Sequence, residues 1–172
     1  MKAVSSATVV PSRFPLTSIN FVLKGGEPNQ LQFWIHFTDN AQTKDYYALK
    51  VERKRQFWND SKYSVENSSL TLNLDDEPLL NTSSGLDDIL MIENEFYRNL
   101  YYWDDTKIQG KSYKVRLNTN YEADYEDDFI TPDGVEHIKC QVKYRISLYS
   151  LSEEFYRYLK SLNDQKNNGL GN

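Results

Sequence analysis

The stretch IKCQVKYRISL, residues 138–148, decides the fold class of this 172-residue chain. Apolar residues occupy every second position, and polar or charged residues fill the positions between them. Side chains alternate between the two faces of a β-strand, so the pattern predicts a strand that is buried on one face and solvated on the other. Cys140 shares the inward parity, which predicts a buried, unreactive thiol.

The same alternation predicts further strands earlier in the chain. They lie at residues 19–23, 31–37, 47–51, 70–74 and 113–119. About six strands with one apolar face each favour two antiparallel sheets packed face to face, an all-β sandwich. Their shared parity predicts one core built from Phe33, Ile35, Leu49, Val115, Leu117, Val142 and Ile146.

A tyrosine supports a more specific sandwich type. Tyr113 follows a turn at Gly110 and opens an alternating strand, which resembles the tyrosine corner of fibronectin type III and immunoglobulin-like sandwiches. We therefore expect a largely buried Tyr113 whose hydroxyl bonds a nearby backbone carbonyl.

The period of the pattern changes after residue 150. Phe155, Tyr158, Leu159 and Leu162 follow an N-cap serine, Ser150 or Ser152, and have helical spacing. This predicts a short helix that docks on the sandwich through these four side chains. The expected organisation is a tail at 1–15, a sandwich at 16–150 with an irregular insertion at about 75–105, and a helix with a tail at 151–172.

Composition excludes several classes of function. Lys and Arg total 20 against 25 Asp and Glu, a net charge of −5, which disfavours nucleic acid as a partner. The single cysteine allows no disulfide within the chain. The first residues, MKAVSSA, form no apolar leader, and no apolar run is long enough to span a bilayer, so we expect a soluble chain without a signal peptide.

Residues capable of catalysis or metal binding do not form a recognisable motif. His36, His137 and Cys140 are too few for a structural zinc site, which usually needs four ligands. Acidic residues cluster at 75–77, 87–88, 104–105 and 124–128 without the spacing of an EF-hand. We expect solvated loops, no cofactor and no metal, with calcium binding at an acidic loop and a hydrolase built on loop carboxylates as alternatives.

An excess of aromatic residues near the expected loops provides the candidate binding residues. They are Trp58, Tyr63, Tyr101, Tyr102 and Trp103, with Tyr97 and Tyr125 nearby. Exposed rings stack on sugars or form protein-binding patches, whereas buried rings would close the open ends of the sandwich. Both interpretations are consistent with the sequence.

Three stretches together resemble a known family. They are FTD at 37–39 with DYYALKV at 45–51, WDDTKIQGKSY at 103–113, and LYSLSEEFYRYLKSL at 148–162. They are similar to a large Bacteroidetes family of cell-envelope lipoproteins that carry a domain of unknown function, 4249. Members of that family begin with a lipoprotein signal and an immunoglobulin-like part, and continue past the helix, so the chain resembles the later part of a longer protein.

The resemblance implies a location and a partner. It places the protein in the cell envelope, at the outer membrane or the cell surface, beside a TonB-dependent outer-membrane receptor. Membrane attachment would occur only through a lipid anchor absent from this chain, and no catalytic residues are implied. We expect a non-catalytic module that assists receptor-linked binding or uptake, with a carbohydrate-binding module that uses the loop aromatics as the alternative.

Overall fold

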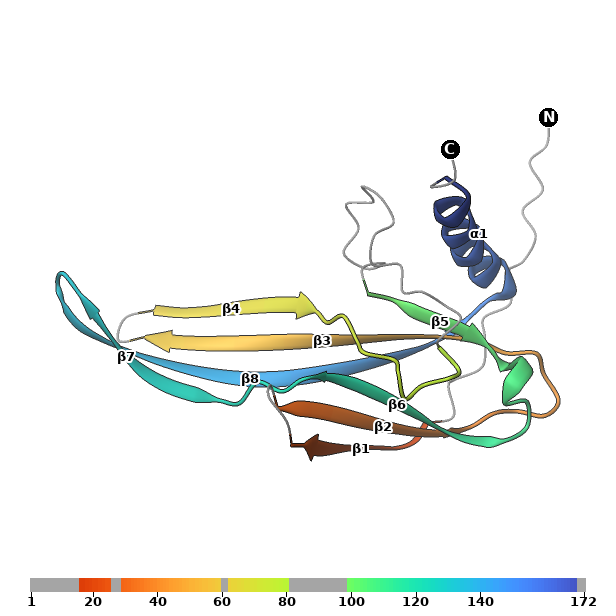
Figure 1. Cartoon of the computed structure of the whole chain (residues 1–172), viewed down its shortest axis with the longest axis horizontal. Coiled ribbons are helices and arrows are strands. Elements are labelled where there is room, and N and C mark those ends of the chain that lie inside the picture. Colours follow the sequence, from red (N-terminus) through yellow and green to blue (C-terminus); the bar gives the residue numbers. More distant parts are fainter. Residues whose placement is uncertain (1–15, 26–28, 60–61, 81–98, 170–172) are drawn as a thin grey trace.

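The computed structural model describes residues 16–25, 29–59, 62–80 and 99–169. The described residues form an antiparallel all-β sandwich with one C-terminal helix, which confirms the predicted fold class (Figure 1). In chain order the elements are β1 (Leu16–Lys24), β2 (Gln30–Thr38), β3 (Tyr46–Asn59), β4 (Lys62–Ser69), β5 (Tyr101–Asp104), a 3-10 turn (Asp105–Lys107), β6 (Ser112–Asn120), β7 (Tyr125–Thr131), β8 (Gly134–Leu151) and α1 (Glu153–Gly169).

Two sheets of unequal length make up the sandwich. The small sheet has the order β1-β2-β6, and the large sheet has the order β4-β3-β8-β7, with β5 also paired to β3. The longest pairing joins β3 to β8 in one unbroken register from Tyr46 opposite Leu151 to Asn59 opposite Ile138. The large sheet extends well past the end of the small sheet, toward the left of Figure 1. Part of the large sheet therefore has no sheet packed against it.

The core between the sheets contains most of the predicted residues. Five of the seven are buried: Phe33, Ile35, Leu49, Val115 and Leu117. Ile146 is half-buried and packs against this cluster. Val142 is the exception, because it is half-buried and lines a groove at the edge of the sandwich. Alternation predicted which way Val142 points, but the sheet opposite does not cover it.

Tyr113 has a different partner from the one we expected. It is half-buried, and its hydroxyl donates to the Glu77 carboxylate at 2.8 Å rather than to a backbone carbonyl. Glu77 is fully buried and also accepts the backbone N–H of Arg116 at 2.7 Å and of Leu79 at 2.9 Å. The acidic side chain thus attaches the segment after β4 to β6.

Several elements differ from the sequence prediction. Residues 70–74 are not a strand, since only a single bridge joins Asn73 to Asn118, whereas the polar stretch before them forms β4. Residues 125–128 of the acidic stretch form the first part of β7, where a solvated loop was expected, and β5 lies inside the expected insertion. The apolar stretch 89–92 lies outside the described residues.

The helix docks on the outer face of the large sheet, beside β3 and β5. Leu159 is fully buried there against Ala48 and Tyr102, and Phe155 and Leu162 flank it. Tyr158 was expected in this contact but is 45% exposed. Tyr156 takes its place, with its ring centroid 4.7 Å from that of Tyr46. The buried face of the helix is therefore rotated by part of a turn from the predicted face.

The helix contact can be tested with two neighbouring positions. Leu159→Ala removes a fully buried side chain and should lower the free energy of unfolding by about 2–5 kcal/mol. Tyr158→Ala, the matched control, should change it by about 0.5 kcal/mol or less, because its ring is largely solvated. Urea denaturation followed by circular dichroism measures both. Equal effects would contradict the observed orientation of the helix.

The role of Glu77 gives a second stability prediction. Glu77→Ala leaves two backbone N–H groups without their acceptor and should cost about 2–5 kcal/mol, whereas Tyr113→Phe removes one hydrogen bond to a charged group, about 1.5–3 kcal/mol. Asp75→Ala, at an exposed neighbour, should cost about 0.5 kcal/mol or less. Thermal melts at matched pH test whether the three substitutions lower stability in this order. A Glu77 variant as stable as the Asp75 variant would show that Glu77 does not hold the segment after β4 against β6.

Candidate functional site

An apolar groove opens at one side of the sandwich, between the two sheets. It has a volume of about 690 Å³. One wall comes from β1 and β2, the opposite wall comes from β8, and the segment between β6 and β7 closes one end. The apolar lining residues are Ile19, Phe21, Leu31, Phe33, Tyr121, Val142, Tyr144 and Ile146.

The groove is open because both of its walls end in edge strands, β1 in the small sheet and the second half of β8 in the large sheet, and no strand of the described residues pairs beyond them. Ile19, Phe21 and Leu23 pair with buried residues of β2, so they share the inward face of the small sheet. These three side chains are nevertheless 42%, 67% and 53% exposed. In the large sheet, β7 pairs with β8 only as far as Cys140, which leaves the second half of β8 at the edge. Inward-facing apolar side chains are therefore left in contact with solvent.

Charged groups at the closed end of the groove are held by ion pairs. Glu122 accepts from Arg55 at 2.7 and 2.8 Å and lies 2.6 Å from an Arg53 nitrogen. Hydrogen bonding to Arg55, aided by the charge of Arg53, lowers the pKa of the Glu122 carboxyl below its usual range, although partial burial opposes this shift. The exposed Asp124 accepts the backbone N–H of Val142 at 2.7 Å. The arginines therefore neutralise Glu122, whereas the carboxylate of Asp124 lies at the surface of this end of the groove.

Three of the five predicted binding residues are buried. Tyr101, Tyr102 and Trp103 are 2–4% exposed, because β5 lies between the core and the helix. Trp103 packs against Phe37 and Tyr47, and the Tyr102 hydroxyl donates to the Leu159 carbonyl at 3.3 Å. Burial raises the pKa of Tyr102 to about 12. These rings are part of the packing and are not available to stack on a ligand.

The other two predicted residues lie together, far from the first three. Trp58 and Tyr63 pair across β3 and β4, with ring centroids 5.3 Å apart and ring planes at 45°. Trp58 also lines a shallow hollow with Glu126, Asp128 and His137. The tilt of the two rings does not give the flat platform on which a sugar stacks. Tyr125 is 41% exposed, and Tyr97 lies outside the described residues.

The histidines and the cysteine do not come together. His36 lies on the outer face of the small sheet, and His137 lies in β8, 2.5 Å from an Asp128 oxygen. Cys140 is fully buried, as its parity predicted. Cys140 therefore shares no site with either imidazole.

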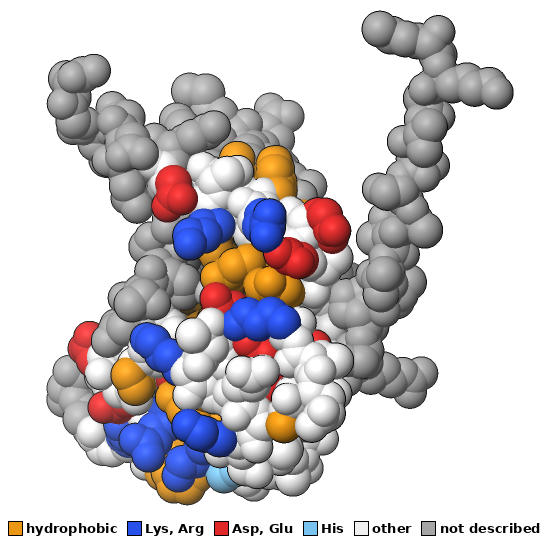
Figure 2. Space-filling model, turned by 90° about the vertical axis from the view of Figure 1, so that its right-hand side faces the viewer, with side chains coloured by type: hydrophobic (Ala, Val, Ile, Leu, Met, Phe, Trp, Pro, Cys, Tyr) orange, Lys and Arg blue, Asp and Glu red, His pale blue; other side chains and the backbone are white. Residues whose placement is uncertain are grey.

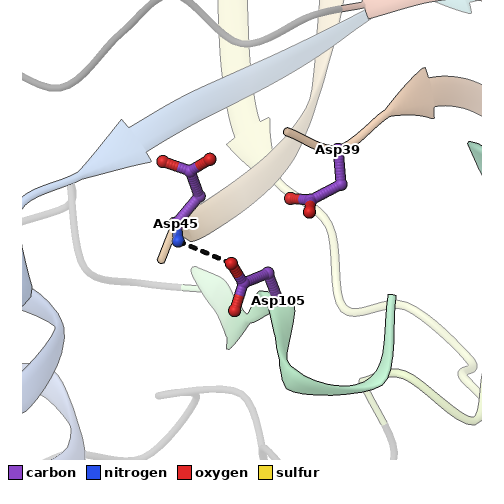
Figure 3. Close-up of side chains that lie close together, drawn as sticks. All are labelled: Asp39, Asp45 and Asp105. Atoms are coloured by element: carbon purple, nitrogen blue, oxygen red, sulfur yellow. Dashed lines mark hydrogen bonds between the residues drawn. The ribbon is translucent and has the colours of Figure 1, made fainter. Parts of the chain in front are cut away.

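Three carboxylates, two from the β2–β3 loop and one from the turn after β5, meet near the other end of the molecule. Asp39, Asp45 and Asp105 place oxygens within 4.8 Å of one another, and Figure 3 shows the three side chains close together, with the Asp45 backbone N–H donating to Asp105. Of the four predicted acidic clusters, only 104–105 contributes to this group; the cluster at 87–88 lies outside the described residues.

Protein donors already occupy most of these carboxylate oxygens. Asp39 accepts the Tyr47 hydroxyl at 2.5 Å and the Gly110 backbone N–H at 2.8 Å. Asp105 is fully buried and accepts the Asp45 backbone N–H at 2.7 Å together with the Lys44 ammonium group. The group fastens the β2–β3 loop to the turn after β5. Hydrogen bonding within the protein accounts for its geometry without an ion.

Basic side chains gather on the small sheet, away from the groove. Figure 2 shows Lys and Arg side chains clustered over the lower part of the end-on view, where the small sheet lies. Lys114 and Arg116 point outward from β6, and the Lys114 ammonium lies 4.4 Å from the centre of the Trp34 ring. No ion pair within the described part of the chain involves either residue. The outer face of β6 is thus basic, whereas the exposed charge at the closed end of the groove is the carboxylate of Asp124.

Comparison with known proteins gives one match. The model of a family named for a domain of unknown function, DUF4249, matches residues 1–172. The chain belongs to the DUF4249 family. No curated protein and no solved structure matched it. Among the described residues of this DUF4249 chain, no helix has the length and apolar character needed to cross a membrane.

Sequence reasoning did not find the groove of this DUF4249 protein. Ile19, Phe21 and Val142 were recognised as strand residues, and Val142 was assigned to the core. The available signal was the composition of β1, whose first eight residues, LTSINFVL, carry no charge although the strand lies at a sheet edge. The lack of charge in β1 indicates an exposed apolar edge only when the strand order is known, because the order shows that β1 lies at the edge of its sheet.

The ion pairs at the closed end predict a pH-dependent stability. The pKa of Glu122 is lowered by folding, so its contribution is present above the unfolded pKa of about 4.3 and is lost as the pH falls through the folded pKa. Glu122→Gln should cost about 1–3 kcal/mol near pH 7, and this difference from wild type should shrink below about pH 4. Urea melts across pH 3–7 measure it.

An exposed ion pair supplies the control. Glu126 lies 2.5 Å from Lys139, and both side chains are more than half exposed. Glu126→Gln should therefore cost less than about 1 kcal/mol at any pH. A Glu122 variant that behaved in the same way would show that the partly buried ion pairs of Glu122 with Arg53 and Arg55 contribute little.

Proposed function

We propose that the chain is a non-catalytic binding module of a cell-envelope lipoprotein, and that it holds a polypeptide partner in the groove between its sheets. One observation carries the proposal. Side chains of β1 that face inward, and would be core residues in a closed sandwich, are about half exposed along an apolar groove. Exposed apolar surface of this kind, bordered by polar residues, is typical of protein interaction sites.

The polar groups beside the groove support binding rather than catalysis. Glu122 is engaged by two arginines, and Asp124 accepts a backbone N–H. A general acid or base needs a pKa adjusted toward the working pH, whereas the arginines move the pKa of Glu122 in the opposite direction. The polar groups at this end therefore serve to fix the segment that closes the groove.

The resemblance to envelope lipoproteins supports one class of partner. It suggests an outer-membrane receptor of the TonB-dependent type, with the module assisting binding or uptake. A glycan is the weaker candidate, because three of the five aromatic residues proposed for it are buried and the remaining two are tilted. A polypeptide matches the apolar groove better, since apolar and aromatic side chains dominate the centres of protein interfaces.

Site-specific crosslinking tests this proposal in the host that produces the protein. A photoreactive benzoylphenylalanine replaces Phe21 in the groove, and in a matched variant it replaces Arg116 on the basic outer face, which is also exposed. We expect a covalent adduct with one polypeptide from position 21 and a much weaker one from position 116, identified by mass spectrometry. Equal adducts at the two positions, or a glycan in place of a polypeptide at position 21, would overturn the proposal.

A further inference from the structure

Two free sheet edges border the groove. β1 pairs with β2 on one side, and no strand of the described chain pairs with its other side. The half of β8 from Gln141 to Leu151 pairs with β3 alone. The backbone N–H of Val142 points away from β3, since it donates to Asp124. N–H groups of a strand alternate in direction, so those of Tyr144 and Ile146 face the same open side.

β1 lacks the features that normally protect an edge strand. The edge strand β4 carries Lys62 and Glu66, and β7 carries three consecutive acidic residues. In β1 the only charge is Lys24 at the very end, and five of its side chains are exposed apolar groups: Leu16, Ile19, Phe21, Val22 and Leu23. Natural edges use charges, prolines or bulges to prevent pairing with another chain. The one irregularity of β1 lies at its start, between Leu16 and Ser18.

We propose that the partner of the groove is an extended polypeptide strand that adds to the free edge of β1. This inference rests on the proposed function and specifies how the same site binds. A strand satisfies the unpaired N–H and C=O groups along the edge, which a helix or a small apolar ligand leaves unpaired. Its alternate side chains extend the apolar row of Ile19, Phe21 and Leu23 and cover the groove.

Charge complementarity fixes the direction of the added strand. The end of the groove that carries Asp124 lies beside the C-terminal end of β1, because Tyr121 donates its backbone N–H to the Asn29 carbonyl, next to Gln30, which pairs with Lys24. Asp124 is exposed there and, within the described part of the chain, takes part in no ion pair. Antiparallel pairing is the more stable arrangement per residue. An antiparallel partner brings its N-terminal end to Asp124, so it carries Lys or Arg at that end.

Synthetic peptides provide the probe. The peptide KTVTVTVTS alternates apolar residues behind an N-terminal lysine, and KTTVVVTTS has the same composition without alternation. With the ¹⁵N-labelled full chain, we expect the first peptide to shift the amide signals of β1 and of residues 142–146, and to slow exchange at alternate amides of β1. The second peptide should bind at least about tenfold more weakly, a difference of about 1.4 kcal/mol.

Two further peptides separate strand addition from simple apolar contact. A version of KTVTVTVTS with N-methyl groups at alternate positions loses the backbone bonds of a strand and should bind at least about tenfold more weakly. ETVTVTVTS, with glutamate in place of the lysine, should also bind more weakly, and that difference should disappear with Asp124→Asn. If the methylated peptide binds as well as the parent, strand addition is wrong, although a polypeptide crosslinked at position 21 would still support the proposed function.

Chain variants complete the test. Phe21→Lys places a charge on the inward face and should abolish peptide binding, whereas Phe129→Lys, at a similarly exposed aromatic residue of β7, should leave it unchanged. Both positions are exposed, so both variants should fold. Equal binding by the two variants would overturn the inference. So would a concentration-dependent dimer of the unliganded chain that protects the β1 amides, because the occupant would then be a second copy.

Discussion

The rest of the structure depends on the pairing of β3 with β8. Both strands cross the whole length of the large sheet, and their inner faces supply Leu49, Val51 and Ile146 to the core. Their outer faces supply Ala48 and Tyr149 to the surface on which the helix rests. The same pairing extends past the small sheet, so it also creates the part of the large sheet that remains uncovered. The core, the position of the helix and the uncovered part of the large sheet all follow from this one long register.

Buried acidic side chains hold the loops onto this framework. Glu77, Asp39 and Asp105 each accept backbone N–H groups from segments distant in sequence. A carboxylate with two oxygens can satisfy several donors at once, which suits it to joining irregular segments whose N–H groups lack strand partners. These acids therefore replace regular hydrogen bonding where the chain passes between the sheets.

Alternation in the sequence predicted which face of its strand each side chain lies on. It did not predict whether another element packs over that face. Leu117 and Val142 have the same pattern around them, yet one is fully buried and the other lines the groove, because only strand order decides which residues are covered. Tyr101 and Trp103 looked like loop residues because β5 is too short to show a period. Asp105 appeared to belong to a solvated cluster, since no local pattern marks a carboxylate that will meet N–H groups from another loop. The helix was found because its period and its cap are local signals.

The long β3–β8 register also has a consequence for how the chain reaches its fold. Its partners come from opposite halves of the sequence, and contacts between distant residues slow folding because the intervening chain must be ordered first. During synthesis β3 emerges well before β8. Until β8 appears, the edge of β3 that β8 will occupy is open to pairing with other chains. A nascent chain of this design therefore depends on its surroundings for protection during the interval between the two strands.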